Sequence, residues 1–570
     1  MDKSGARHWL DRYGTGYHAW SRDGDEFSRP CGLCEFKFDY DGRYFGGRAD
    51  VNALVDLGVS TRLSGDELRH HALLAFTLLR LRHPLLAARA ELRTLEVEPW
   101  FLVRVPRSPE AAVRDAESAL QFLDSGVDGV SDVTDFYAHA QNVARIVKPS
   151  EALGRVFVLT GKAEGGTRQK LHFLFVMAHE IVDGLSCMNW TSDLIRIVNM
   201  PTEKLRREIE TAISPESIRA KLPPAQEDLY APVAATKART RWFWAITLIL
   251  RHVKKPLPAA FRNPLRRATP LSAARPFPPK YPNALDYSQT PPLNTFYITL
   301  QLSPAASQRL YRLCKEAKAS IGAGGFVLVG MAMMAVHESR YPDEPESARR
   351  PFIGSFPLNP RPFFGAKDLL ESVMLAFSQG VVLPFLPSHL DVEGRFKLLV
   401  RQASRQLSAF QKRDRLRSPT DAMAYMGIKG AGRLMATNYI DGIERLRDLL
   451  PAHLKDALPS PQGEFDAPRW AVSNATCGVS SVGPVDWSAS KFDLDADPAD
   501  GVVASLERFC SGVRVRETEF LVGTWSEAGI IGAGVSFDGN FIDESSAHLW
   551  VEKMKSILEV PDAADLRPHL

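Results

Sequence analysis

A run of apolar residues that stops at a histidine is the feature that most limits how this chain can fold. The segment FLFVMAHEIVDGLSC covers residues 173–187. Its β-branched and aromatic residues predict a buried strand up to position 178, and the apolar residues at helical spacing after Gly184 predict a helix. His179 and Asp183 therefore fall in the turn between a strand and a helix. Side chains in such turns project into clefts more readily than those in element centres.

The chain is too long for one hydrophobic core. It has 570 residues, whereas single cores stop growing at about 250 to 300 residues. Residues 221–292 are dense in proline and arginine, which is typical of a linker or crossover. We therefore predict a domain over residues 1–220 that carries HEIVDG, a crossover over 221–292 with one short apolar helix, and a second domain over 293–570.

Local signals place several elements inside these domains. Ser64 and Glu67 form a capping box that predicts the start of a long core helix. Residues 155–162 and 170–178 read as neighbouring strands because the turn-forming segment AEGGTRQ separates them. In the second domain, residues 295–302 alternate as a strand does, and a helix follows. Both domains thus combine strands with helices.

Composition gives no sign of a nucleic-acid partner. The 70 Lys and Arg residues nearly balance the 67 Asp and Glu residues, for a net charge of +3. The first residues, MDKSGARHWLDRYGTG, lack the apolar core expected of a secretory signal, and no stretch reaches the roughly 18 uninterrupted apolar residues of a membrane span. A cytoplasmic location is therefore expected. Residues 242–255 join aromatic and aliphatic side chains to basic ones, so they favour a helix docked on a domain and leave open a weak contact with a membrane surface.

The cysteines indicate a reducing compartment. Only 6 occur in the chain, and Cys187 lies among apolar helical residues that suit a buried free thiol. Cys31 and Cys34 form CGLC, but a zinc site needs a second ligand pair and none stands at useful spacing.

Three interpretations of HEIVDG compete. A structural histidine would have to explain several polar groups buried at the end of an apolar strand, which is costly. A metal site of the form HExxD would use Glu180 as a general base, yet it needs a helix through the motif to bring His179 and Asp183 onto one face. In the third interpretation His179 itself is a general base that takes a proton from a hydroxyl or amine.

The arrangement strand, HxxxDG, helix resembles the CoA-dependent acyltransferase superfamily, which includes chloramphenicol acetyltransferase, peptide-synthetase condensation domains and the plant and fungal alcohol acyltransferases. The resemblance extends along nearly the whole chain. ELRHHALLAFTLLRLRHPLL is similar to the first helix of the family, SFPLNPRPFF to its strand with an Asn-x-Arg element, and RWAVSNATCGVSSVGPVDW to its Ser-Asn segment. The Asp-Phe-Gly-Trp-Gly motif of the plant-type branch is missing. The order of the segments looks most like that of fungal secondary-metabolite O-acetyltransferases of the trichothecene 15-O-acetyltransferase kind.

The resemblance implies an α/β (α+β) fold of two similar domains, each a mixed sheet flanked by helices, with an active-site tunnel between them. It implies that His179 is the general base, that Asp183 pairs with Arg361 through a bidentate ion pair, and that Gly184 leaves room for substrate. The resemblance makes three residues candidates for substrate or oxyanion binding: Ser473, Asn474 and Ser480.

The same resemblance implies direct acyl transfer. Acyl-CoA, expected to be acetyl-CoA, would be a co-substrate, and no metal or tightly bound cofactor is expected. The acceptor would be a hydroxyl of a small secondary metabolite, and the enzyme is expected to be a monomer. Two alternatives remain: a protein of the same fold that uses the tunnel for condensation or cyclisation of a metabolite, and the metal-dependent hydrolase of the HExxD interpretation.

Overall fold

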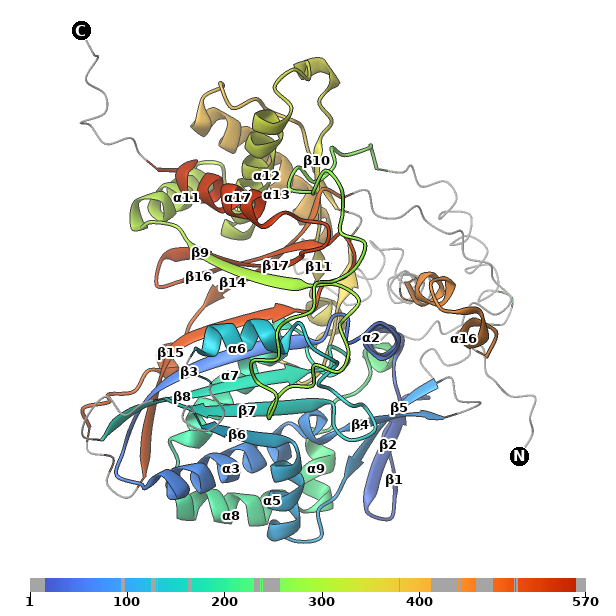
Figure 1. Cartoon of the computed structure of the whole chain (residues 1–570), viewed down its shortest axis with the longest axis vertical. Coiled ribbons are helices and arrows are strands. Elements are labelled where there is room, and N and C mark those ends of the chain that lie inside the picture. The colour runs from blue at the N-terminus through green and yellow to red at the C-terminus, as the bar shows by residue number, and fades with distance from the viewer. Residues whose placement is uncertain are drawn as a thin grey trace.

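The computed structural model describes most of the chain, and Figure 1 shows it as two stacked layered regions. The structure describes residues 16–93, 98–124, 132–161, 167–229, 257–366, 368–378, 380–411, 442–457, 475–496 and 501–559, together with the single positions 130, 236, 238, 439 and 498. The segment 242–255, for which a membrane contact was left open, lies outside these residues, as do Ser473 and Asn474.

The first half is built on a five-stranded mixed sheet in the order β15-β3-β8-β7-β6. The strand pairs are antiparallel except β6 with β7. The strands are β3 (Val51–Thr61), β6 (Leu120–Asp124), β7 (Gly154–Thr160), β8 (Arg168–Met177) and β15 (Val502–Val513). The two strands predicted at 155–162 and 170–178 are therefore confirmed as the neighbours β7 and β8.

Strand β15 comes from the far end of the sequence. It pairs with β3 along its whole length, from Val502 opposite Thr61 to Val513 opposite Val51. The orange ribbon of β15 lies beside the blue β3 in Figure 1. All eleven residues of β3 are buried, which fits a strand paired on both sides and covered on both faces. The first sheet is therefore completed by the C-terminal part of the chain, while the proposed domain boundaries remain a prediction.

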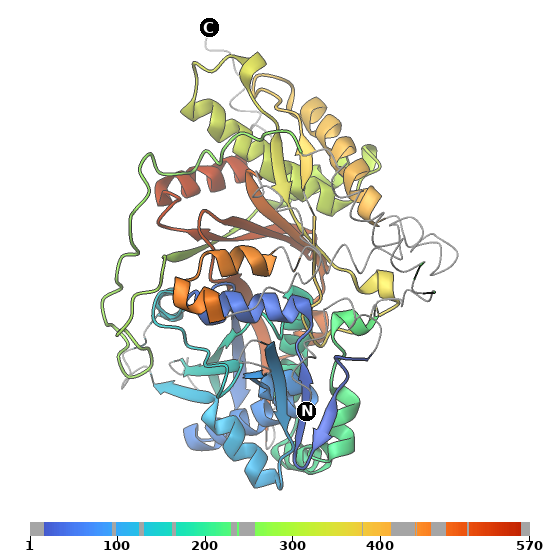
Figure 2. The same ribbon diagram turned by 90° about the vertical axis from the view of Figure 1, so that its right-hand side faces the viewer.

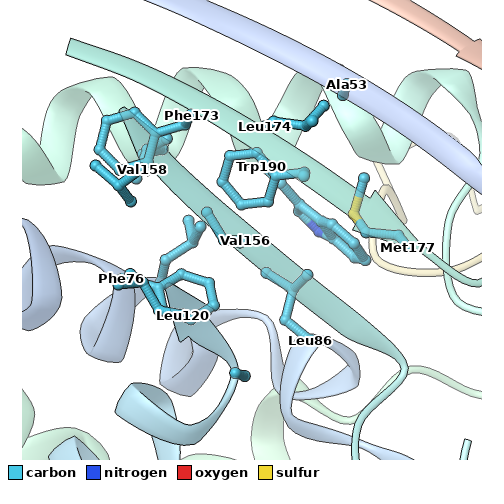
Figure 3. Close-up of a cluster of buried hydrophobic side chains, with 14 of the residues drawn as sticks. Ala53, Phe76, Leu86, Leu120, Val156, Val158, Phe173, Leu174, Met177 and Trp190 are labelled. Atoms are coloured by element: carbon cyan, nitrogen blue, oxygen red, sulfur yellow. The ribbon is translucent and has the colours of Figure 1, made fainter. Parts of the chain in front are cut away.

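Helices pack on this sheet, and the apolar side chains of the helices and the sheet together form a hydrophobic core. Figure 3 shows Phe76 and Trp190 against Val156, Val158 and Phe173 of the sheet. Phe76 belongs to α3, whose N-cap Ser64 accepts from the Glu67 backbone N–H as the capping box predicts. The helices of this half are α3 (Gly65–Arg82), α5 (Pro109–Ser118), α6 (Val133–Ala140), α7 (Gly184–Val198), α8 (Thr202–Ala212) and α9 (Pro215–Lys221).

A small antiparallel sheet and one helix stand beside this core. The sheet has the order β1-β2-β5-β4, with β1 (Ser21–Asp23), β2 (Glu26–Pro30), β4 (Arg89–Arg93) and β5 (Glu98–Arg104). The chain then enters helix α2 (Leu33–Tyr44). Tyr40 of α2 packs against Leu446 and Leu450 of the second half. In Figure 2 the blue α2 and the orange helices of residues 442–457 lie side by side, so α2 bridges the two halves.

The second half carries a six-stranded mixed sheet in the order β13-β10-β14-β16-β17-β9. Its strands are β9 (Thr295–Gln301), β10 (Phe352–Ser355), β13 (Val381–Leu383), β14 (Cys477–Val485), β16 (Phe520–Glu527) and β17 (Ile530–Asp538). A two-stranded ribbon joins β11 (Pro357–Leu358) to β12 (Ala376–Phe377). Its helices are α11 (Pro304–Glu316), α12 (Ile321–Arg340), α13 (Val392–Gln411), α16 (Ala452–Ala457) and α17 (Glu544–Ser556). Two mixed sheets flanked by helices confirm the predicted fold class.

Helix α12 is long and apolar enough to cross a membrane by length and composition alone. In the fold, however, 83% of its most apolar window is buried, as in a core helix of a globular protein. Met331 and Met333 are fully enclosed. The helix ends at Arg340, just before Pro342, which lacks the backbone N–H that a further turn would need.

Most of the described part of the crossover, residues 257–292, runs along the side of both halves (Figure 2). The backbone N–H of Ala144 in the first half donates to the carbonyl of Asp286, and the N–H of Phe261 donates to the carbonyl of Pro351 in the second half. The crossover therefore lies against both halves along its described length.

Candidate active site

His179 lies in the turn that joins β8 to α7. Strand β8 ends at Met177, and the N–H of Ile181 donates to the carbonyl of Ala178 at 3.2 Å, which closes the turn. Helix α7 then begins at Gly184 with Asp183 as its N-cap. The structure thus confirms the expected strand, turn and helix around HEIVDG, and it excludes the continuous helix that HExxD metal binding requires.

The ring of His179 stacks on Phe38 of helix α2. The two ring centroids are 4.1 Å apart and the planes differ by 14°. Nδ1 of His179 is buried and makes no hydrogen bond to the described residues. His179 as a whole is half-buried, and the stack on Phe38 fixes the orientation of its ring.

The pKa of His179 is lowered to about 4, mainly by burial and in addition by the positive charge of Arg516. Asp183 and the backbone carbonyl groups of His179 and Val182 raise the pKa and oppose this shift in part. The imidazole is therefore neutral at physiological pH. A neutral imidazole can accept a proton at its unprotonated ring nitrogen.

Both oxygens of the Asp183 carboxylate are occupied by groups other than the histidine ring. Oδ1 accepts from the backbone N–H groups of Leu185 and Ser186 at 3.0 and 2.9 Å, and from the Ser186 hydroxyl at 2.8 Å. Oδ2 accepts from the N–H of Met374 at 3.1 Å and lies 2.8 Å from Nη2 of Arg361. Asp183 therefore caps α7 on one side and holds the second half of the molecule on the other.

Arg361 reaches Asp183 across the two halves, as predicted. Its side chain is 1% exposed. Nη2 also donates to the carbonyl of Ser372 at 2.6 Å, and Nε donates to the carbonyl of Leu369 at 2.5 Å. The expected bidentate geometry is wrong: Nη2 pairs with the carboxylate, whereas Nε is directed at the carbonyl of Leu369 and Nη1 donates to Oδ1 of Asn359 at 3.4 Å. The expected strand at this position is also wrong, since Arg361 begins a short 3-10 helix, η4 (Arg361–Phe364), that follows Pro360.

Gly184 stands next to strand β14 of the second half. A Cβ built on Gly184 would lie 3.7 Å from Cγ1 of Val482, which is an ordinary contact, and Gly184 itself is exposed. The pairing of β14 with β16 shifts between Ser481 and Gly483, so a bulge redirects the strand here. Ser480 lies on the same strand, and its carbonyl accepts from the Thr524 hydroxyl at 3.1 Å. Of the three oxyanion candidates only Ser480 is among the described residues.

Glu180 lies in the same turn, next to His179 in the sequence. Its side chain is fully enclosed, and neither carboxyl oxygen has a hydrogen-bond partner in the described chain. Burial raises its pKa well above the usual range, the nearby Asp39 raises it further, and Arg145 and Arg43 act in the opposite direction. A carboxyl held protonated in this way cannot serve as the general base of an HExxD metal site. The described residues also contain no group of three His, Cys, Asp or Glu side chains arranged to hold a metal ion.

Cys187 is a core thiol. It is 2% exposed within helix α7, and burial raises its pKa to about 12. Because the nucleophile of a cysteine enzyme is an accessible thiolate, the structure supports the interpretation of Cys187 as a packing residue. Cys31 and Cys34 are buried as well and are not disulfide-bonded.

Sequence reasoning missed the residues that surround His179 from distant parts of the chain. Phe38 stacks on the ring, Arg516 lowers its pKa, and the backbone of Ser372 and Met374 joins Asp183 to Arg361. No local pattern marks these long-range contacts. One signal was present: Asp183 followed by Ser186 is a capping box, because the Asp183 N–H donates to the Ser186 hydroxyl at 3.1 Å in return.

Comparison with known proteins gives a fold but no sequence relative. No protein-family model and no curated protein sequence matches this chain. Among solved structures, the trichothecene 15-O-acetyltransferase TRI3 from Fusarium sporotrichioides superimposes with a TM-score of 0.65 over 95% of this chain and 97% of its own, at 13% identity. The chain shares the fold of this acetyltransferase. At such identity the likeness concerns the fold and not the reaction.

A second solved structure points to the same architecture. The four-domain nonribosomal peptide synthetase AB3403, in its holo form bound to AMP and glycine, matches with a TM-score of 0.51 at 13% identity. The match covers 94% of this chain and 33% of the synthetase. The fold of this chain therefore also occurs as one part of this four-domain synthetase.

Proposed function

We propose that this protein is an acyl-CoA-dependent O-acyltransferase that transfers an acyl group, expected to be acetyl, to a hydroxyl of a small secondary metabolite. One observation carries the proposal: a neutral, half-buried histidine stands at the strand-to-helix turn of a fold that this chain shares with an acetyltransferase. The carboxylate that follows it does not touch the ring but ties the turn to the second half.

The chemistry requires a base and no covalent enzyme intermediate. His179 Nε2 takes the proton of the acceptor hydroxyl as the oxygen attacks the thioester carbon. The tetrahedral oxyanion then collapses, the carbon–sulfur bond breaks, and the imidazolium returns the proton to the CoA thiolate. The products are the ester and free CoA. Because Cys187 is buried and its thiol stays protonated, direct transfer is the route that the described residues support.

Asp183 and Arg361 are positioning residues in this proposal. Their ion pair and the hydrogen bond to Met374 hold the start of α7 against the second half. Rigid placement of the base is worth a large part of an enzymatic rate enhancement, since a reacting group has to stay within about 3 to 3.5 Å of its partner. We assign the oxyanion donors to the β14 region, where Ser473, Asn474 and Ser480 remain the candidates.

The partners follow from the reaction. Acyl-CoA and a hydroxylated metabolite are co-substrates, and the enzyme needs no metal or tightly bound cofactor. We further propose a monomer in the cytoplasm. A condensation or cyclisation reaction in the same fold is the second candidate, because part of a nonribosomal peptide synthetase has this architecture too.

Radiolabelled acetyl-CoA incubated with a panel of hydroxylated terpenoids and polyketides tests the proposal. Acyl transfer predicts a labelled ester and one equivalent of free CoA thiol for each ester formed. Conversion of an acceptor to an isomer or a cyclised product that carries no radiolabel, without release of CoA thiol, would favour the second candidate. If no acceptor gives either product with acetyl-, malonyl- or longer acyl-CoA, the result counts against both candidate functions.

A further inference from the structure

The arginines of the crossover line a cavity far from HEIVDG in the fold. The cavity has a volume of about 450 Å³ and lies between crossover residues 264–269, the C-terminal end of α12 and the first turns of α17. These two helices cover the face of the second sheet that is turned away from the first half (Figure 1). The cavity shares no lining residue with the candidate active site.

The cavity carries more positive than negative charge. Arg266, Arg267 and Arg340 line it against a single carboxylate, Asp543. That carboxylate is already engaged: it accepts from Ser545 and Ser546 at the N-cap of α17 and pairs with Arg267 at 3.3 Å. Arg267 is therefore compensated, and the N-terminus of α17 is occupied by its own cap.

Two guanidinium groups are left without a carboxylate partner among the described residues. Arg266 is half-buried over the ring of Phe541, 4.9 Å from its centroid, and its Nε is buried with no hydrogen-bond acceptor. Burial lowers the pKa of Arg266, and the charge of Arg262 lowers it further. Arg340 donates to the carbonyl of Pro264 at 2.5 Å and meets no acid. A half-buried cation that is repelled by its neighbours is stabilised when an anion binds beside it.

The composition of the wall limits the ligand. Two uncompensated positive charges match one dianion, and guanidinium groups bind phosphate with paired hydrogen bonds. The hydroxyl group of Thr269 lies in the same wall and can donate to a further oxygen, whereas the hydroxyl of Ser339 donates to the carbonyl of Ala335 at 3.1 Å. The cavity is far larger than one phosphate group, and Val336 and Leu549 give it an apolar side. Cavities of about 300 to 1,000 Å³ hold small organic ligands.

We infer that this cavity is a binding site for a phosphate monoester of a small organic molecule. Arg266 and Arg340 hold the phosphate, and the apolar side holds the organic body. The site is separate from the acyl-transfer site and does not depend on the proposed function.

Calorimetric titration of the full-length protein tests the inference. The probes are AMP and glucose 6-phosphate, with adenosine and glucose as uncharged controls and chloride to keep the ionic strength constant. Vesicles of phosphatidylcholine with or without phosphatidic acid show whether the phosphate can come from a lipid headgroup. Saturable binding of a phosphate probe, or of the phosphatidic acid vesicles alone, supports the site and identifies the source.

Variants locate the binding. Arg266→Gln and Arg340→Gln should each weaken binding about tenfold or more, as loss of a charge-assisted hydrogen bond predicts. Ser339→Trp should block the cavity without changing the charge. Arg350→Gln is the matched control, because Arg350 is exposed and lies outside the cavity. Circular dichroism melting of each variant confirms its folding.

Two results would overturn the inference. One is the absence of saturable binding by every phosphate probe and by the phosphatidic acid vesicles. The other is equal weakening by Arg266→Gln and Arg350→Gln, because binding would then follow net charge rather than this cavity.

Discussion

Replacing Asp183 should damage the fold more than replacing an ordinary helix cap, because its carboxylate joins two halves of the molecule. Asp183 is 4% and Arg361 1% exposed in their side chains. Removing one partner of a buried ion pair costs about 3 to 5 kcal/mol. Loss of an N-cap costs about 1 kcal/mol. Loss of the ion pair and loss of the cap both remove the same carboxylate, so their costs do not add fully. Asp183→Ala should therefore lower the free energy of unfolding by about 4 kcal/mol.

Asp183→Asn separates the charge from the cap. An asparagine can keep an oxygen at the Oδ1 position and so continue to cap α7. Its amide NH₂ would then face the N–H of Met374 and Nη2 of Arg361, which are both donors. We therefore expect Asp183→Asn to cost about 3 kcal/mol, most of the effect of the alanine variant.

Two controls make this prediction specific. Asp132 caps α6 through the N–H groups of Thr134 and Asp135 and is itself exposed, so Asp132→Ala should cost about 1 kcal/mol. Ser186→Ala removes one donor to Asp183 and should also cost about 1 kcal/mol. Urea unfolding followed by fluorescence and circular dichroism gives the free energies. An Asp183→Ala variant as stable as Asp132→Ala would refute the argument that the carboxylate joins the two halves.

Four further predictions concern the candidate active site. The acyl-transfer rate should rise with pH through the low pKa of His179, about 4, and stay flat near neutrality; a limb near pH 6.5 would show that the ring is solvated. Folding lowers this pKa from 6.5, so neutral His179 contributes its full stabilisation above pH 6.5 and loses it as the pH falls towards 4. The free energy of unfolding of wild type should therefore fall more steeply with acid than that of His179→Gln. Phe38→Leu removes the stacked ring and should reduce kcat about tenfold at unchanged fold, whereas the same change at the core residue Phe136 should lower stability without a selective effect on kcat. Cys187→Ala should leave the transfer rate within about twofold of wild type, and a loss of about 100-fold or more would restore a covalent route.

Local signals explain what the sequence predicts about this fold. The capping box at Ser64, the apolar strand before His179 and the proline after α12 act within a few residues, so each sets an element without tertiary information. The pairing of β15 with β3 has no such signal. The segment from Val502 to Val513 reads as a strand, but nothing in it names a partner that lies about 450 residues earlier in the chain.

The candidate site divides in the same way. The turn around His179 follows from its own sequence, and the family resemblance gives the partner of Asp183. The single contact in place of a bidentate pair depends on where the carbonyls of Leu369 and Ser372 lie. The stack of Phe38 on His179 depends on how α2 packs between the halves. These are outcomes of tertiary packing, which local patterns do not encode.

The most direct test of the central claim is the rate of acyl transfer by His179→Ala and His179→Gln, once an accepted acyl-CoA and acceptor are known. Release of CoA thiol and formation of labelled ester are measured together, and the unfolding transition shows whether the fold is kept. Loss of general-base catalysis predicts a fall of about 10²- to 10⁴-fold in kcat for both variants, with acyl-CoA still bound. Transfer within a few-fold of wild type by either folded variant would contradict the assignment of His179 as the base.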